Sequence, residues 1–273
     1  ITAGAGGSVY VTGYTGSTNF PVTVLPIPHR STLVGGYDGF VSQLNANGTA
    51  LLASTYVGGT NSEYPRSIAV RSGSSVVIAG QSSSTAVSTP APVQSPFDGT
   101  LGGTTDAHAV QFTLNLSTVN WANFLGGANS IGDDWGQAVA ADAVGNVYVT
   151  GYTNTSDYPT LNSYDPAIGG NQDAFLSKFS TAGDIPTLIW STYLGGSNND
   201  WGYSLAVDPL NRVYVAGTTA SSDFPLQAAW DSTSSGYEAF LTRFNPDGTL
   251  SYSTFVGGTS TDYGRAVAVD SSS

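Results

Sequence analysis

The pattern of hydrophobic and polar positions along the chain repeats four times. A short apolar run begins at Val9, Val76, Val147 and Val213, and each run ends in a glycine. The four valines are 66 to 71 residues apart. A period of this length indicates one structural unit per repeat, stacked on copies of itself.

Each repeat contains four short runs with the character of β-strands. In the third repeat these runs are residues 139–141, 147–152, 174–179 and 188–194, and Val, Ile, Tyr, Phe and Thr dominate them. Several runs alternate apolar with polar residues, as half-buried strands do. No segment keeps the i, i+3, i+4, i+7 spacing of a substantial helix. The sequence therefore predicts an all-β protein.

The links between the runs predict antiparallel blades. The first and second runs, and the third and fourth, are joined by tight turns such as Asn245-Pro246-Asp247-Gly248. Pro and Gly occupy the places that turns prefer. The link from the second run to the third is much longer and contains motifs such as Asp157-Tyr158-Pro159. Four-stranded antiparallel units of this length are typical of β-propellers.

We expect a single β-propeller domain over residues 1–273, with repeats at approximately 9–70, 76–141, 147–207 and 213–269. The chain starts at the second strand of one blade and ends after the first strand of another. Residues 266–270 would then complete the blade begun by residues 9–14, which gives a four-bladed ring with the terminal strands sharing one blade. The alternative is four consecutive blades of a larger propeller.

Several motifs resemble those of the bacterial β-propeller repeat family known as SBBP. They include Val147-Tyr148-Val149-Thr150-Gly151, Ser156-Asp157-Tyr158-Pro159 and Asp200-Trp201-Gly202. This resemblance implies seven blades and large, secreted proteins, but it supplies no reaction. The second repeat departs from the pattern: Ser83-Ser84-Thr85 lacks the Asp-aromatic-Pro motif, and His108 stands where other repeats have phenylalanine.

Two sets of repeated acids are the main chemical feature. The first-strand acids each follow a Gly-Gly pair and precede an aromatic residue; they are Glu63, Asp134, Asp200 and Asp262. The third-strand acids precede the third run; they are Asp38, Asp106, Asp173 and Glu238. In an antiparallel meander both sets lie at the same end of the strands. Such acids commonly hold turns by accepting backbone hydrogen bonds. The alternative is bound Ca²⁺, for which the third-strand acids are the candidate ligands.

The aromatic residues after the first-strand acids are Tyr64, Trp135, Trp201 and Tyr263, which we call the first-strand aromatics. They either wedge between neighbouring blades or form a platform on which sugars stack. Together with the first-strand acids they are the candidate binding residues, on a face to which the long loops bring most of the 19 acidic residues. Such a face attracts cationic groups.

Composition excludes several classes of function. The net charge of −12 argues against a nucleic-acid partner, since phosphate binding needs a basic surface. There is no cysteine, and no run of ~18 apolar residues long enough for a membrane span. Neither His29 nor His108 lies in a recognisable nucleophile motif, so no catalytic residue is assigned. Low lysine content and abundant Ser, Thr, Asn and Gly favour a secreted or surface-displayed protein.

These observations predict a non-catalytic extracellular β-propeller that serves as a binding, adhesion or structural scaffold module. Its expected partners are a glycan or protein at the cell surface, with self-association through exposed edge strands as a further option. The alternative function is a glycan-acting hydrolase or lyase that uses carboxylates on the long-loop face, because paired carboxylates alone can cleave glycosides.

Overall fold

A computed structural model describes residues 1–23, 29–71, 73–86, 101–127, 132–181 and 186–270. Four four-stranded antiparallel sheets make up the fold, together with one 3₁₀ turn at Ala5–Gly7. The first sheet contains β1 (Thr2–Ala3), β2 (Val9–Thr15), β3 (Asp38–Leu44) and β4 (Leu51–Val57). The second contains β5 (Glu63–Arg71), β6 (Ser75–Ser82), β7 (Asp106–Thr113) and β8 (Val119–Leu125).

The third sheet contains β9 (Asp134–Ala141), β10 (Val147–Thr153), β11 (Asp173–Ser180) and β12 (Thr187–Leu194). The fourth contains β13 (Asp200–Val207), β14 (Val213–Thr219), β15 (Glu238–Phe244) and β16 (Leu250–Val256). In each sheet the strands follow one another in sequence order, so every sheet is a meander. The predicted all-β propeller of four-stranded antiparallel blades is thus confirmed. Among the described residues no helix has the length and apolar character needed to cross a membrane.

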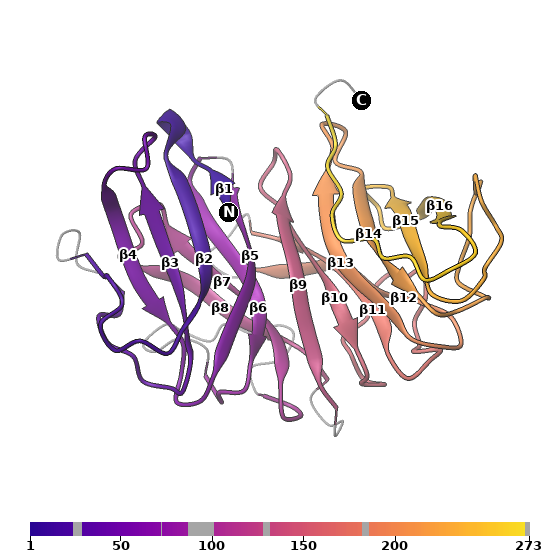
Figure 1. The fold of residues 1–273 in the computed structure, drawn as a ribbon, viewed down its shortest axis with the longest axis horizontal. Helices are drawn as coiled ribbons and strands as arrows, with labels where there is room; N and C mark the ends of the chain where they lie inside the picture. Colours follow the sequence, from indigo (N-terminus) through magenta and orange to yellow (C-terminus); the bar gives the residue numbers. More distant parts are fainter. Residues whose placement is uncertain (24–28, 72, 87–100, 128–131, 182–185, 271–273) are drawn as a thin grey trace.

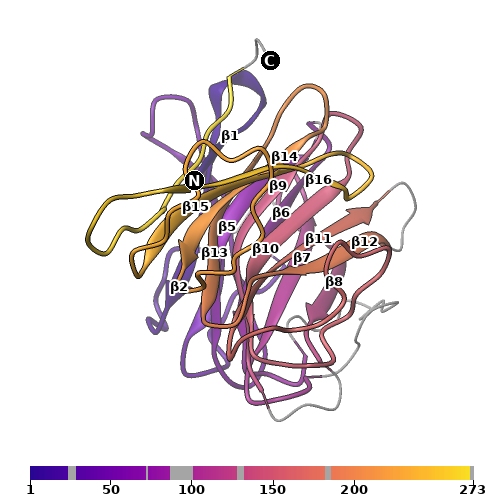
Figure 2. The same ribbon diagram turned by 90° about the vertical axis from the view of Figure 1, so that its right-hand side faces the viewer.

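The sheets succeed one another as an arc, from β1–β4 to β13–β16 (Figure 1). The inner strands β5, β9 and β13 lie side by side across its middle, and Figure 2 shows the arc from its β13–β16 end. The core lies between successive sheets. One apolar cluster joins the first sheet to the second, for example Val57 with Ile78, and another joins Leu194 of the third to Val215 of the fourth.

The expected ring closure is wrong in this structure. We predicted that residues 266–270 would pair with residues 9–14, but β2 has β1 and β3 as its neighbours. Residues 264–267 lie instead against β13 and β14, where the Gly264 N–H donates to the Gly217 carbonyl at 3.3 Å. β1 belongs to the first sheet, and residues 264–267 lie beside the fourth (Figure 1). The terminal strands therefore do not share a blade in this structure, and the alternative, four consecutive blades of a larger propeller, stays a prediction.

Local sequence explains the turns and one recurring irregularity. The Asn245-Pro246-Asp247-Gly248 turn forms as predicted, with Gly248 at φ 88° and its N–H bonded to the Asn245 carbonyl at 3.0 Å. Each complete inner strand has a β-bulge after its acid and aromatic residues, at Arg66, Gln137 and Tyr203. A bulge leaves one residue unpaired and turns its side chain away from the regular alternation.

Candidate functional site

The repeated acids lie at the junctions between blades, where the end of one blade leads into the inner strand of the next. Six of them, Asp38, Glu63, Asp106, Asp134, Asp173 and Asp200, have no exposed surface, and Glu238 is 1% exposed. Asp262 is half-buried. The carboxyl groups on this end of the strands are therefore mostly enclosed by backbone.

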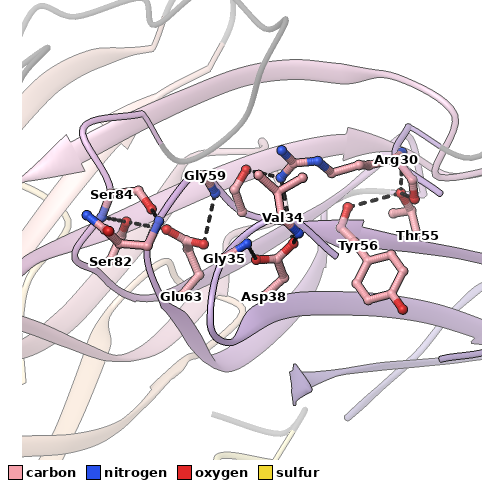
Figure 3. A network of polar contacts seen from close by, with 12 residues as sticks. Arg30, Val34, Gly35, Asp38, Thr55, Tyr56, Gly59, Glu63, Ser82 and Ser84 are labelled. Atoms are coloured by element: carbon pink, nitrogen blue, oxygen red, sulfur yellow. Dashed lines mark hydrogen bonds and ion pairs between the residues drawn. The ribbon is translucent and has the colours of Figure 1, made fainter. Parts of the chain in front are cut away.

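Figure 3 shows the first junction. The carboxyl group of Asp38 accepts the N–H groups of Val34 and Gly35, both at 2.9 Å. Glu63 accepts the Gly59 N–H and the Ser82 hydroxyl, also at 2.9 Å. Arg30, from the long loop between β2 and β3, lies 3.8 Å from Asp38 and bonds the Gly58 carbonyl. Asp38 thus holds the end of the β2–β3 loop, and Glu63 holds the segment that connects the first blade to the second, as the turn-holding interpretation predicts.

The same arrangement recurs at the junction between the third and fourth sheets. Asp173 accepts the N–H groups of Gly169 (2.8 Å) and Gly170 (3.1 Å), and Asp200 accepts that of Gly196 (2.8 Å). A Cβ on Gly195 would lie 2.6 Å from the Asp173 carboxyl carbon and 2.7 Å from an Asp200 carboxyl oxygen. The two carboxyl groups therefore enclose one glycine that has no room for a side chain.

Burial controls the protonation of these acids. Desolvation raises the pKa of Asp134 and of Asp200 from 3.8 to about 7, against the effect of the hydroxyl and N–H groups that donate to them. Desolvation likewise raises the pKa of Asp173 to about 6 and raises that of Glu63. The neighbouring acid adds to the increase at these sites. A carboxyl group in this setting favours its neutral form.

Sequence reasoning missed the hydroxyl groups that complete these sites. Ser221 donates to Asp200 at 2.8 Å, and Thr155 donates to Asp134 at 3.1 Å. Both follow the second strand of their blade, two residues after another hydroxyl residue, Thr219 or Thr153. A Ser/Thr-x-Ser/Thr pattern after each second strand was the available signal.

The first-strand aromatics combine contacts at the junctions with partial exposure. Trp135 stacks on Tyr152 with ring centroids 4.7 Å apart. Trp201 stacks on Tyr237 at 5.9 Å, and its indole N–H donates to Gln172 at 2.7 Å. Tyr64, Trp135 and Trp201 are half-buried, and Tyr263 is 54% exposed. Trp201 thus contacts the neighbouring blade through Gln172, whereas Trp135 stacks on a residue of its own sheet, and part of each ring faces solvent.

The residues at the β-bulges lie next to these rings and differ in chemical type from blade to blade. Arg66 is exposed, while Gln137 and Tyr203 are half-buried. At the equivalent place in the segment after β16, the Arg265 guanidinium lies 4.4 Å from the Tyr203 ring centroid and 5.0 Å from that of Tyr263. Cation–π contacts of this kind hold a cationic group between two aromatic faces. Sequence analysis did not identify this position, although it always lies two residues after the aromatic residue of the acid–aromatic pair.

The calcium candidates are engaged with backbone and hydroxyl groups. Asp38, Asp106 and Asp173 accept loop N–H groups, and Glu238 accepts the N–H of Ser235 at 2.9 Å. Within the described ranges no group of three or more His, Asp or Glu side chains gathers as a metal site would require. Calcium at these acids stays a prediction.

The two histidines lie in apolar surroundings. His108 is a β7 residue, as predicted, and is completely buried; among the described residues its two ring nitrogens have no hydrogen-bond partner. Burial lowers its pKa to about 3. His29 lies edge-on to Phe112 with centroids 6.0 Å apart, and burial, followed by the charge of Arg30, lowers its pKa.

Comparison with known proteins supports the fold at two places. No curated protein matches the chain. The family model for the SBBP β-propeller repeat matches residues 125–159 and 189–225. Each match runs from the last strand of one sheet through the inner and second strands of the next, and thus contains one blade junction. These two stretches are therefore similar to the SBBP β-propeller repeat, as the motifs within them indicated.

Proposed function

We propose that this chain is a non-catalytic binding and scaffold module that acts outside the cell. The observation that carries the proposal is the row of partly exposed side chains along β5, β9, β13 and residues 262–265. Aromatic rings alternate there with Arg66, Gln137, Tyr203 and Arg265, which differ from blade to blade. Rigid strands hold these groups, and a preorganised surface loses little conformational entropy on binding.

The proposed ligand is a glycan or a protein segment at the cell surface. Aromatic faces pack against the apolar faces of sugars and against apolar side chains, and arginine donates several hydrogen bonds. The net charge of −12 favours ligands that are neutral or cationic overall. The surface is therefore suited to a neutral glycan in the first place.

A glycan array tests this proposal. Replacing Trp135 and Trp201 by alanine should abolish binding that the wild-type chain shows. The matched control is Trp230→Ala, because Trp230 is 78% exposed and lies in the link between β14 and β15. Equal binding by wild type and the double variant would show that this surface is not the site.

The alternative function, glycan cleavage by paired carboxylates, has one observation in its favour. The acids of each junction are close enough to enclose a single glycine, and retaining glycosidases use carboxyl groups roughly 5 Å apart. The burial of these acids opposes it, since a catalytic carboxyl group must reach the sugar. Incubation of each bound glycan with the chain distinguishes the two, because release of reducing ends would support the hydrolase.

The extracellular location and the binding of calcium are two separate proposals, and each has its own test. Immunogold labelling of source cells should place the protein on the surface or in the medium, and labelling confined to the cell interior would contradict an extracellular role. For calcium, melting curves in excess Ca²⁺ and in EDTA should differ if the third-strand acids bind the ion. Equal midpoints would remove the ion from the proposal.

A further inference from the structure

Three aromatic rings occupy the same position on neighbouring strands in the interior of the arc. Tyr64, Trp135 and Trp201 each follow the acid that begins β5, β9 or β13, and the β-bulge of each strand lies two residues further on. Because β9 contacts both β5 and β13, the three rings form one row across the inner strands (Figure 1). The sheet that carries Trp135 has a complete four-stranded sheet on each side, so its surroundings do not depend on the chain ends.

Each ring of the row packs against a second aromatic ring. The pairs are Tyr64 with Tyr37 (centroids 6.0 Å apart), Trp135 with Tyr152 (4.7 Å) and Trp201 with Tyr237 (5.9 Å). The hydrogen bond from the Trp201 indole N–H to Gln172 fixes that ring further. All three rings of the row are nevertheless half-buried, so part of each is open to solvent. Rings that are held in place before a ligand arrives bind it at a low cost in conformational entropy.

The acids that precede these rings do not make the row an anionic surface. Glu63, Asp134 and Asp200 have no exposed surface. Burial raises the pKa of Glu63, and it raises the pKa of Asp134 and of Asp200 to about 7. Because these carboxyl groups are enclosed and their neutral form is favoured, the row is suited to a ligand without net charge.

Hydrogen-bonding groups accompany the rings and connect one blade to the next. Arg66 is exposed and Tyr203 is half-buried, and both lie near Tyr152 of the blade between them. Burial raises the pKa of Tyr152, the Tyr203 hydroxyl adds to the increase, and the charge of Arg66 opposes it. The bulge residues of β5 and β13 therefore reach the ring pair that belongs to β9 and β10. The row is thus one continuous surface over three blades.

The spacing of the row favours a long ligand. Stacked sheets pack about 10 Å apart, so equivalent rings on successive blades are separated by a similar distance. A single sugar ring is shorter than this spacing and contacts one blade, whereas a chain of linked sugars extends from one aromatic ring to the next. Once one stretch of such a chain is held, the next stretch has a high effective concentration at the neighbouring blade. Affinity should therefore depend on the length of the ligand.

We propose that the row of Tyr64, Trp135 and Trp201 binds the interior of a neutral, extended β-linked polysaccharide chain of the cellulose or chitin type, which lies across β5, β9 and β13. This inference rests on the glycan binding proposed above and specifies the class of glycan. An extended β-linked chain is ribbon-like, so its sugars present flat apolar faces in succession to the aromatic rings. Its hydroxyl groups lie along the edges of the ribbon, where side chains such as Arg66 and Gln137 can pair with them.

Oligosaccharides of increasing length test this inference. Isothermal titration calorimetry measures the dissociation constants of cello-oligosaccharides and N-acetylated chito-oligosaccharides, each from the disaccharide to the hexasaccharide. At least one series should bind, and its dissociation constant should fall about twofold to tenfold for each further aromatic ring that the oligomer reaches. Trp135→Ala interrupts the row at its centre, so the longest oligomer should then bind no better than the shortest. Trp135→Tyr keeps a ring at this position and should preserve the dependence on length.

The outcomes distinguish this inference from the proposed function. Equal affinity for all lengths, or binding of neither series by a chain that binds other glycans on the array, would overturn the inference and leave glycan binding intact. Absence of binding to any glycan would contradict the proposed function as well. Binding to extended peptides on a peptide array, lost in Trp135→Ala and without sugar binding, would assign the row to a protein partner instead. The matched control Trp230→Ala, in the link between β14 and β15, should leave every dissociation constant unchanged.

Discussion

The buried acid Asp200 provides the sharpest test of how the junctions are held. Its Oδ2 atom accepts both the Gly196 N–H and the Ser221 hydroxyl, each at 2.8 Å. Replacing Asp200 by asparagine keeps one carbonyl oxygen for these two donors and removes the proton equilibrium. The variant therefore isolates the contribution of charge from that of hydrogen bonding.

The raised pKa of Asp200 determines whether the free energy of unfolding rises or falls with pH. Desolvation raises the pKa of Asp200 from 3.8 to about 7, so between these values the folded chain binds more protons than the unfolded chain. Stability then falls as the pH rises, and the contribution present below about pH 4 is lost through about pH 7. At 1.36 kcal/mol per pKa unit, a shift of this size corresponds to about 4 kcal/mol as an upper limit.

Urea unfolding at about pH 4 and about pH 8 measures this difference. Asp200→Asn should match the wild type at low pH and exceed its free energy of unfolding at high pH. The comparison with the wild type matters because His108, with its pKa lowered to about 3, makes stability rise with pH in the same range. A difference between variant and wild type that does not depend on pH would refute the reasoning.

Asp223→Asn is the matched control for the opposite sign. Asp223 is exposed and accepts the N–H and hydroxyl of Ser197, and these bonds lower its pKa. Its contribution is present at neutral pH and is lost as the pH falls, so this variant should lose stability at high pH.

Three further substitutions test the packing. His108→Phe should raise the free energy of unfolding by about 1–3 kcal/mol in thermal melts, since it removes two buried nitrogens that have no hydrogen-bond partner among the residues described; a lower midpoint would contradict this. Gly195→Ala should destabilise by about 1–3 kcal/mol, because its Cβ would meet both carboxyl groups, whereas Gly258→Ala has open space and should be neutral in the same urea titration. Tyr193→Phe loses bonds to the Thr155 carbonyl (2.8 Å) and the Tyr158 N–H (3.1 Å); a cost of about 1–3 kcal/mol in urea unfolding is expected, and an unchanged midpoint would show that they contribute nothing.

The blades could be predicted from the sequence because local patterns determine them. Runs of β-branched and aromatic residues such as Val147–Thr153 and turn residues such as Gly248 act over a few residues, and both the strand and the turn formed as expected. The inner strands were underestimated: β9 begins at Asp134, five residues before the predicted start at Val139. Its bulge interrupts the alternation on which the prediction relied.

The ring closure failed for a different physical reason. Complementary ends predict that two strands fit each other, but whether they meet depends on the angle between successive blades. That angle is set by how side chains such as Leu194 and Val215 pack between sheets, which a periodic pattern does not specify. The burial of Asp134 and Asp200 could not be predicted from the sequence for the same reason. A repeated acid gives the same sequence pattern whether the neighbouring loop exposes it or covers it.

The repeat itself indicates how to separate structural from functional residues in this chain. A residue type that recurs in every blade is expected to have a structural role common to all blades. The first-strand acids agree with this, because each accepts a hydrogen bond from the second glycine of its Gly-Gly pair. Ligand recognition by an arc needs positions that differ between blades. The bulge position satisfies this condition: it offers arginine, glutamine, tyrosine and arginine in turn, beside rings that stay partly open. Substitutions there should alter binding while leaving the junctions intact, which is the reverse of what substitutions at the acids should do.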